Sequence, residues 1–169
     1  KVGRLLKLAK TKKIFCMVGF NLRFLPIVQK ITQLLKQKKL GKILASDLYV
    51  GQYLPDWRPI KKYAETYSAS FKLGGGTALD LIHEVDLAYQ WFELNTLKII
   101  SHKLGQLNTD TEDYVHITTT KPPAITITLD TLNKVKTRQY RIIGTGGSLY
   151  CDVYRKYAVM PDLRSNQTI

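Results

Sequence analysis

The chain has 169 residues, of which 44% are hydrophobic and 23% are charged, a composition typical of one globular domain rather than of a disordered segment. The net charge of +13 suggests a nucleic-acid-binding protein, but the basic residues are spread over several segments and no nucleic-acid-binding motif accompanies them. We also expect no membrane partner and no signal peptide, because no apolar run approaches the roughly 18 residues of a transmembrane helix and the basic opening has no hydrophobic core.

The first predicted elements are the end of an amphipathic helix over residues 1–10 and a buried strand over residues 14–20. Together they resemble the last helix–strand step of an α/β domain whose earlier strands are missing, so the edge of this strand is expected to be exposed. Asn21 and Arg23 come where the strand leaves the sheet, a usual place for ligand contacts in open α/β folds. The alternative is a polar turn into the next helix.

A helix is predicted from Pro26 to Gly41, followed by a long strand over residues 43–53. The loop after it has prolines on both sides of Trp57 and Arg58, and Tyr63 and Tyr67 follow on the same connection. Aromatic faces suit sugar rings, and an arginine suits a carboxylate or a phosphate, so we expect this loop to contact a substrate. The alternative is a loop that packs its own aromatic residues against the domain.

Three glycines, Gly74, Gly75 and Gly76, precede the next predicted helix and allow a sharp turn close to a ligand. Thr77 is predicted as the N-cap, with Asp80 in the third position of a capping box. The helix is expected to run to residues 93–95. Its buried stripe would comprise Ala78, Leu81, Ile82, Val85, Ala88, Tyr89 and Phe92, and the opposite side Asp80, Glu84 and Leu87, with His83 nearby.

His83 lies one turn after Asp80 and near a helix N-terminus, where the positive end of the helix dipole favours a neutral imidazole. Neutral imidazole accepts a proton, so His83 is a candidate general base and Asp80 a candidate partner. The alternatives are that Asp80 is only a helix cap and that His83 is a surface or structural histidine.

The rest of the chain predicts strands over residues 97–107, 114–120, 124–132, 137–143 and 148–153, with a polar tail over residues 160–169. We interpret them as an antiparallel meander. Ile125 and Ile127 alternate with Thr126 and Thr128, which indicates one face covered by helices and a second, more polar face. The fold class is therefore α+β, an open, mostly antiparallel sheet with helices on one face, preceded by the remnant helix–strand unit of a Rossmann domain.

The two cysteines, Cys16 and Cys151, lie in apolar, strand-like runs, with no CxxC pair and no histidine at the spacing of metal ligands. This pattern predicts reduced thiols in a cytoplasmic protein and no metal site. A solvated basic surface is the default explanation of the net charge, and an anionic substrate or a phosphate-bearing cofactor is the alternative.

Four motifs in order resemble the glucose-fructose oxidoreductase / inositol dehydrogenase (Gfo/Idh/MocA) family: VGFNLRF at residues 18–24, GQYLPDWRP at residues 51–59, Gly74–Gly76, and HEVD at residues 83–86. The resemblance implies that residues 1–20 are the remnant of an N-terminal dinucleotide-binding domain. Residues 21–169 would be the substrate-binding and oligomerisation domain, truncated at its C-terminal end. The dinucleotide fingerprint and the Glu-Lys-Pro motif of the family are absent from the chain, so we interpret it as a fragment.

The resemblance further implies an oxidoreductase that uses NAD or NADP and acts on a hydroxyl or ketone of a sugar, cyclitol or sugar derivative. His83 would take the hydroxyl proton and Asp80 would orient it, although many family members place the acid four residues before the histidine instead of three. Cofactor contacts are expected from Asn21 and Arg23. Substrate contacts are expected from Trp57, Arg58, Tyr63, Tyr67, Gly75 and Gly76.

The fragment alone is expected to be inactive and to bind no NAD or NADP, with a non-catalytic module for substrate capture and oligomerisation as the alternative function. Arg58 and the net charge favour an acidic sugar as the small-molecule partner. The polar sheet face is expected to pair subunits in a homo-oligomer. Neither nucleic acid nor a membrane is an expected partner.

Overall fold

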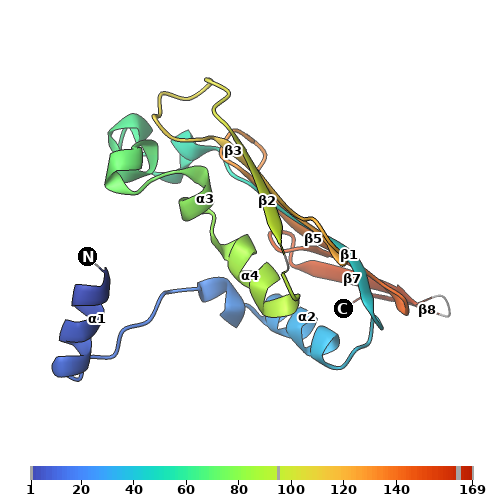
Figure 1. Cartoon of the computed structure of the whole chain (residues 1–169). Coiled ribbons are helices and arrows are strands. Elements are labelled where there is room, and N and C mark those ends of the chain that lie inside the picture. The colour runs from blue at the N-terminus through green and yellow to red at the C-terminus, as the bar shows by residue number, and fades with distance from the viewer. Residues whose placement is uncertain (1, 95, 163–164, 169) are drawn as a thin grey trace.

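The structure, a computed structural model, describes residues 2–94, 96–162 and 165–168. Its centre is one eight-stranded sheet in the order β2-β3-β4-β1-β5-β6-β7-β8, and α2, α3 and α4 lie on one face of it, whereas α1 stands apart (Figure 1). The predicted α+β class, with an open and mostly antiparallel sheet, is confirmed. The strands are β1 (Ile43–Gly51), β2 (Leu97–His102), β3 (Tyr114–Thr119), β4 (Ala124–Asp130), β5 (Thr137–Gly144), β6 (Gly147–Asp152), β7 (Tyr157–Asp162) and β8 (Ser165–Thr168).

The helices are short, and several are single turns. The α-helices are α1 (Val2–Thr11), α2 (Pro26–Lys36), α3 (Thr77–Asp80) and α4 (His83–Trp91). The 3₁₀ turns are η1 (Asn21–Phe24), η2 (Leu54–Trp57), η3 (Tyr63–Glu65), η4 (Tyr67–Ala69) and η5 (Phe71–Leu73). In the part of the chain that the structure describes, none of these helices has the length and apolar character to cross a bilayer.

The central strand of the sheet is β1, although it is the first strand in the chain. It pairs in parallel with β4 and antiparallel with β5, so it separates the hairpins of β2–β4 from those of β5–β8. The predicted antiparallel meander is therefore wrong at this point. The β4–β5 connection passes across the end of β1 instead of forming a tight hairpin, and a local pattern does not reveal such an insertion.

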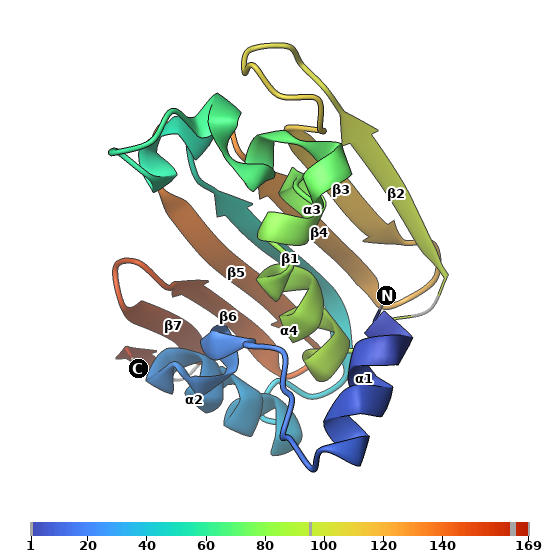
Figure 2. The same ribbon diagram turned by 90° about the vertical axis from the view of Figure 1, so that its left-hand side faces the viewer.

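Alternate residues of the central strands face the helices and form the core. Leu48 of β1 lies beside Ile127 of β4 and Tyr140 of β5, and all three are buried. On the helix side, α2 contributes Val28 and Ile31 with helical spacing, and α4 contributes buried residues of its own. Burial of each large aliphatic side chain contributes about 1.5–3 kcal/mol. Figure 2 shows α4 and α2 lying across this face of the sheet.

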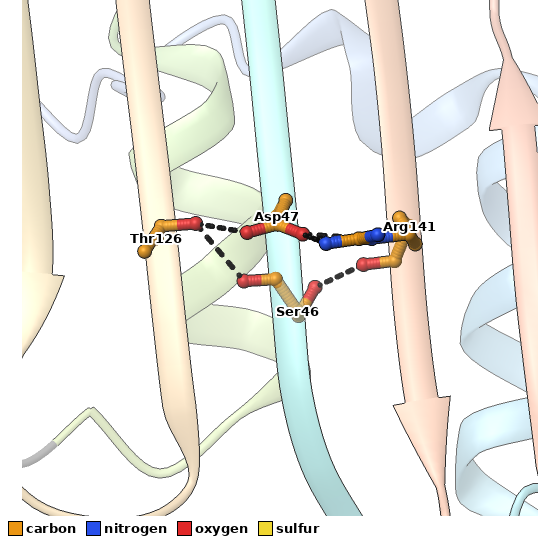
Figure 3. A network of polar contacts seen from close by, with 4 residues as sticks. All are labelled: Ser46, Asp47, Thr126 and Arg141. Carbon is orange, nitrogen blue, oxygen red and sulfur yellow. Dashed lines mark hydrogen bonds and ion pairs between the residues drawn. The ribbon is translucent and has the colours of Figure 1, made fainter.

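The opposite face of the sheet, here called the open face, is polar as the alternation predicts. The Asp47 carboxylate accepts a hydrogen bond from the Thr126 hydroxyl and pairs with the Arg141 guanidinium, whose Nε lies 2.8 Å away (Figure 3). Beside them, the Ser46 hydroxyl donates to the Arg141 carbonyl at 2.9 Å. Three neighbouring strands are thus linked by side chains across the open face.

The predicted buried strand over residues 14–20 does not form. This segment is extended but unpaired within the described residues, and Phe15 and Val18 are 85% and 68% exposed. A strand needs a partner for its backbone groups, and here the segment runs away from the sheet to α1 (Figure 1). That residues 1–20 are the remnant of a dinucleotide-binding domain stays a prediction.

Candidate functional site

The glycine turn before α3 is shaped by close packing with its own domain. Gly74 and Gly76 have φ values of +86° and +126°, which favour glycine. A Cβ at Gly75 would lie 2.1 Å from the Tyr67 carbonyl oxygen. Both Gly75 and Gly76 are buried, so the structure gives each a packing reason, and their substrate contact stays a prediction.

The N-terminus of α3 is capped from another loop, and the predicted capping box is wrong. Gly76 occupies the N-cap position, and Thr77 begins the helix. The Thr77 hydroxyl donates to the Glu112 carbonyl at 2.8 Å and lies 3.0 Å from the Thr131 hydroxyl. The Glu112 carboxylate accepts the Ala78 N–H at 3.0 Å, so Glu112 acts as the cap.

The predicted single helix is broken at Leu81 and Ile82, between α3 and α4. The break changes which residues face the sheet. Glu84 and Leu87, predicted on the outer side, are 0% exposed, whereas Tyr89, predicted in the buried stripe, is 76% exposed. The reason is that Glu84 has a charged partner inside the domain, and this contact sets the rotation of α4.

His83 begins α4 and is half-buried. Its ring meets the Phe20 ring edge-on, with centroids 6.2 Å apart, and its Nδ1 atom is buried without a hydrogen-bond partner among the described residues. Burial lowers the pKa of His83, the positive charge of Arg138 lowers it further, and Asp86 opposes the shift. The imidazole is therefore neutral near pH 7 and able to accept a proton.

The segment after residue 19 is fastened to α4 beside His83. Arg23 of η1 pairs with Asp86, with Nε 2.7 Å from Oδ2, and its guanidinium lies 5.3 Å from the centroid of the Phe20 ring. The predicted residue Arg23 thus lies next to the predicted base. Asn21 is exposed, and among the described hydrogen bonds Asp80 makes none to His83. The acid whose charge acts on His83 is Asp86.

A buried ion pair lies beneath His83, and sequence reasoning missed it. Arg138 Nε is 2.7 Å from Glu84 Oε1, and the Tyr140 hydroxyl donates to the same carboxylate at 3.0 Å. Burial raises the pKa of the Glu84 carboxyl, with Arg138 and Tyr140 opposing the shift. The sequence feature that could have revealed the ion pair is the alternation in β5, which places Arg138 on the same face as Tyr140 and Ile142. An arginine on an apolar face indicates a buried acid.

Trp57 lies at the edge of a cavity of about 300 Å³, lined by Gln52, Tyr53, Asp56, Trp57, Lys134 and Lys136. Trp57 also packs against the core, and its indole N–H is buried without an acceptor among the described residues. Gln52 donates to the Tyr154 hydroxyl at 2.6 Å, and the Arg138 guanidinium lies 5.6 Å from the Tyr154 ring centroid. Trp57 and His83 are therefore linked through intervening side chains and share no lining of this cavity.

The other aromatic residues of the loop contact their own domain. The Arg58 guanidinium lies 5.0 Å from the Tyr67 ring centroid and donates to the Ser68 hydroxyl at 3.3 Å. The Tyr63 hydroxyl accepts the Asn108 N–H at 3.0 Å. These contacts fit the interpretation of a loop that packs its own side chains, and substrate contact by Arg58, Tyr63 and Tyr67 stays a prediction.

The arrangement offers proton transfer at His83 next to basic and aromatic surfaces. Among the described residues, no three His, Cys, Asp or Glu side chains are grouped to hold a metal ion. These residues can provide acid–base chemistry at the imidazole of His83. The guanidinium of Arg23 and the ring of Phe20 next to it offer binding contacts.

The family model described as "GFO/IDH/MocA C-terminal domain" matches residues 28–150. No curated protein matches the sequence significantly. Among solved structures, a levoglucosan dehydrogenase in complex with NADH and L-sorbose has a TM-score of 0.77 and 16% identity, over 92% of this chain and 47% of that one.

Two further structures are similar over 99% of this chain. The inositol dehydrogenase homolog of Azotobacter vinelandii, complexed with NADH and myo-inositol, has a TM-score of 0.75 and 13% identity over 45% of its length. An oxidoreductase of Agrobacterium radiobacter, in complex with NAD+, L-tartaric acid and magnesium, has a TM-score of 0.74 and 16% identity over 49% of its length. The chain thus spans under half the length of each of these structures, and at these identities the likeness shows the fold.

Proposed function

Because the chain belongs to the Gfo/Idh/MocA family, we propose that it is the substrate-binding domain of an NAD(P)-dependent oxidoreductase that acts on a hydroxyl or ketone of a sugar, cyclitol or sugar derivative. The observation that carries this proposal is His83, whose Nδ1 is buried without a partner and whose pKa is lowered by burial and by Arg138. Solved structures of the same fold, bound to NADH and to myo-inositol or L-sorbose, support it.

In this proposal His83 removes the proton of the substrate hydroxyl. Burial, together with the positive charge of Arg138, keeps the imidazole neutral before the reaction, and Asp86 compensates its positive charge afterwards. The role of Asp80 in orienting the ring stays a prediction, because Asp80 ends α3 and makes no described hydrogen bond to His83. The residue pair Arg23 and Asp86 holds the segment around Phe20 beside the base.

The nicotinamide cofactor, when bound, supplies the acceptor for the hydride. A hollow of about 260 Å³ adjoins Phe20, whose ring contacts His83, and it offers apolar side chains together with one guanidinium, a lining that fits such a ring. It is lined by Met17, Val18, Phe20, Arg23 and Phe24. In this chain Arg23 would hold an anionic part of the cofactor, and Phe20 would pack against its ring.

The test is the variant His83→Asn in a protein that joins this chain to a dinucleotide-binding domain. Loss of a general base lowers kcat by about 10²–10⁴-fold, while the Kd for NADH, measured by fluorescence titration, should stay unchanged. The matched control is His116→Asn, since His116 lies on the open face and its Nδ1 is 3.1 Å from the Thr128 hydroxyl. Equal turnover of the two variants would refute the role of His83.

The variant Asp80→Asn separates the two predicted roles of Asp80. If it orients His83, kcat falls and the acidic limb of the pH profile moves. If Asp80 has no part in orienting the ring, both kcat and the pH profile are retained.

A second candidate function is a non-catalytic module for substrate capture and assembly. It is favoured by the open face, where Asp47, Thr126 and Arg141 form a linked polar surface suited to a second copy of the chain. Analytical ultracentrifugation of the chain at several concentrations tests this homo-oligomer. Titration calorimetry with NAD and NADP tests the companion proposal that the chain alone binds neither, and micromolar binding would contradict it.

A further inference from the structure

The cavity beside Trp57 is lined by charged side chains that have no role in the proposed reaction. It lies where β1 and the β4–β5 connection come together, and two of its lining residues, Lys134 and Lys136, are lysines. Asp56 is the one acid among its lining residues. Neither lysine takes part in an ion pair within the residues that the structure describes. The two lysines and Asp56 together give the lining a net charge of +1.

The turn that carries the two lysines is fixed by side-chain hydrogen bonds. The Asp130 carboxylate accepts the Leu132 N–H at 2.6 Å and the Asn133 N–H at 3.1 Å, and the Asn133 side chain accepts the Val135 N–H at 2.9 Å. The Asn133 amide also donates to the Tyr49 hydroxyl at 2.8 Å. The backbone that positions the lysines is thus held before any ligand arrives.

Aromatic rings restrict the two ammonium groups. Lys134 Nζ lies 5.6 Å from the centroid of Tyr53, and Lys136 Nζ lies 4.7 Å from the centroid of Tyr154. Val135, between them, is 72% exposed. Cation–π contacts of this kind hold each ammonium group near its ring, which reduces the conformational entropy that a ligand must remove from each lysine. Both charges therefore border one cavity in a restricted geometry.

Three of the lining side chains, Lys134, Lys136 and Trp57, carry hydrogen-bond donors and no acceptors. Trp57 adds an indole N–H that is buried and without an acceptor among the described residues, and it also adds a flat apolar wall. A donor that is already shielded from water loses no bound water when an acceptor arrives. Ammonium groups and an indole beside an aromatic wall suit an oxyanion attached to a ring-shaped body.

We propose that this cavity binds the anionic group, a carboxylate or a phosphate, of the substrate, so that the substrate is an acidic sugar derivative. This rests on the proposed function, because it names the class of substrate for the same domain. The cavity and the base are joined by side-chain contacts. Gln52 of the lining donates to the Tyr154 hydroxyl, and the Tyr154 ring lies against Arg138, which pairs with Glu84 next to His83. Arg58, the residue predicted to bind the acid, already contacts Tyr67 and Ser68, and the two lysines take that role.

The experiment is titration calorimetry of the chain with D-glucuronate, D-glucose 6-phosphate, D-glucose and inorganic phosphate. The first two probes distinguish a carboxylate from a phosphate, and glucose is the neutral control. The double variant Lys134→Gln, Lys136→Gln should weaken binding of the preferred anionic sugar about tenfold, as expected for two exposed charged contacts. The double variant Lys38→Gln, Lys39→Gln, which removes the same charge at the end of α2, should leave the affinity unchanged.

Tighter binding of one anionic sugar than of glucose, lost only in the Lys134 and Lys136 variant, supports the proposal. Equal binding of glucuronate, glucose 6-phosphate and glucose would overturn it while leaving the oxidoreductase proposal intact. Equal loss of affinity in both double variants would also overturn the proposal, because the effect would then come from net charge. Absence of binding by any of the sugars would overturn it as well. The oxidoreductase proposal is judged separately, by the turnover of the His83→Asn protein.

Discussion

The buried pair of Glu84 and Arg138 gives the sharpest test of the packing around the site. In the variant Arg138→Met, the Glu84 carboxylate stays fully buried and keeps the hydrogen bond from Tyr140 but loses its charged partner at 2.7 Å. Removal of one partner of a buried pair costs about 3–5 kcal/mol. We expect the lower end of this range, since Tyr140 still donates. That loss is a large part of a total stability of about 5–15 kcal/mol.

The same strand provides the matched control. Arg141 pairs with Asp47 on the open face, where the two side chains are 61% and 46% exposed, against 8% and 0% for Arg138 and Glu84. Arg141→Met should therefore cost at most about 1 kcal/mol. Urea unfolding followed by circular dichroism measures both variants. Equal losses would refute the reasoning that burial makes the difference.

The pH dependence gives a second readout of the Arg138→Met variant. Burial raises the pKa of Glu84, and loss of Arg138 raises it further. A carboxyl with a raised folded-state pKa binds more protons in the native state than in the unfolded state, so its contribution to stability falls as the pH rises toward that pKa. The loss in Arg138→Met should be smaller near about pH 5 than near about pH 8. A pH-independent loss would contradict the assignment to Glu84.

Three further predictions concern the glycine turn, the helix cap and the thiols. Gly75→Ala should destabilise the protein by about 1–3 kcal/mol in urea unfolding, because the new Cβ would lie 2.1 Å from the Tyr67 carbonyl oxygen; an unchanged midpoint would show that the turn relaxes freely. Glu112→Ala should cost about 0.5–2 kcal/mol through loss of the α3 cap, whereas Glu112→Gln, which keeps an acceptor, should cost less. Cys16 is exposed, while burial raises the pKa of Cys151 to about 12, so Ellman's reagent should modify one thiol quickly in the native state and both only in urea.

The sequence predicted the elements well where local patterns decide them. Alternation of Ile125 and Ile127 with polar residues fixed the faces of β4, and Pro26 marked the start of α2. It did not predict the place of β1, because pairing of Leu48 with Ile127 joins residues far apart in the chain. Nor did it exclude a strand over residues 14–20, since apolar content predicts a strand even where no partner strand is present.

The site was predicted in part for the same reason. His83 and Arg23 follow from short motifs, and the structure places them beside each other through Phe20. Glu84 was predicted on the outer side because the helical period runs without interruption from Thr77, with no glycine or proline at the break. The break is fixed by contacts with other segments, and these are not visible in a local period.

The adjacency of His83 and Glu84 explains why a buried ion pair lies under this site. Consecutive residues of a helix point about 100° apart, so holding Glu84 against Arg138 leaves His83 at the rim of the buried surface. The same guanidinium then acts on both neighbours, since it offsets the buried carboxylate and lowers the pKa of the imidazole. An apolar pair at these positions would remove the part of the His83 pKa shift that comes from Arg138 and leave the part that comes from burial. Arg138 therefore couples the rotation of α4 to the protonation state of the proposed base.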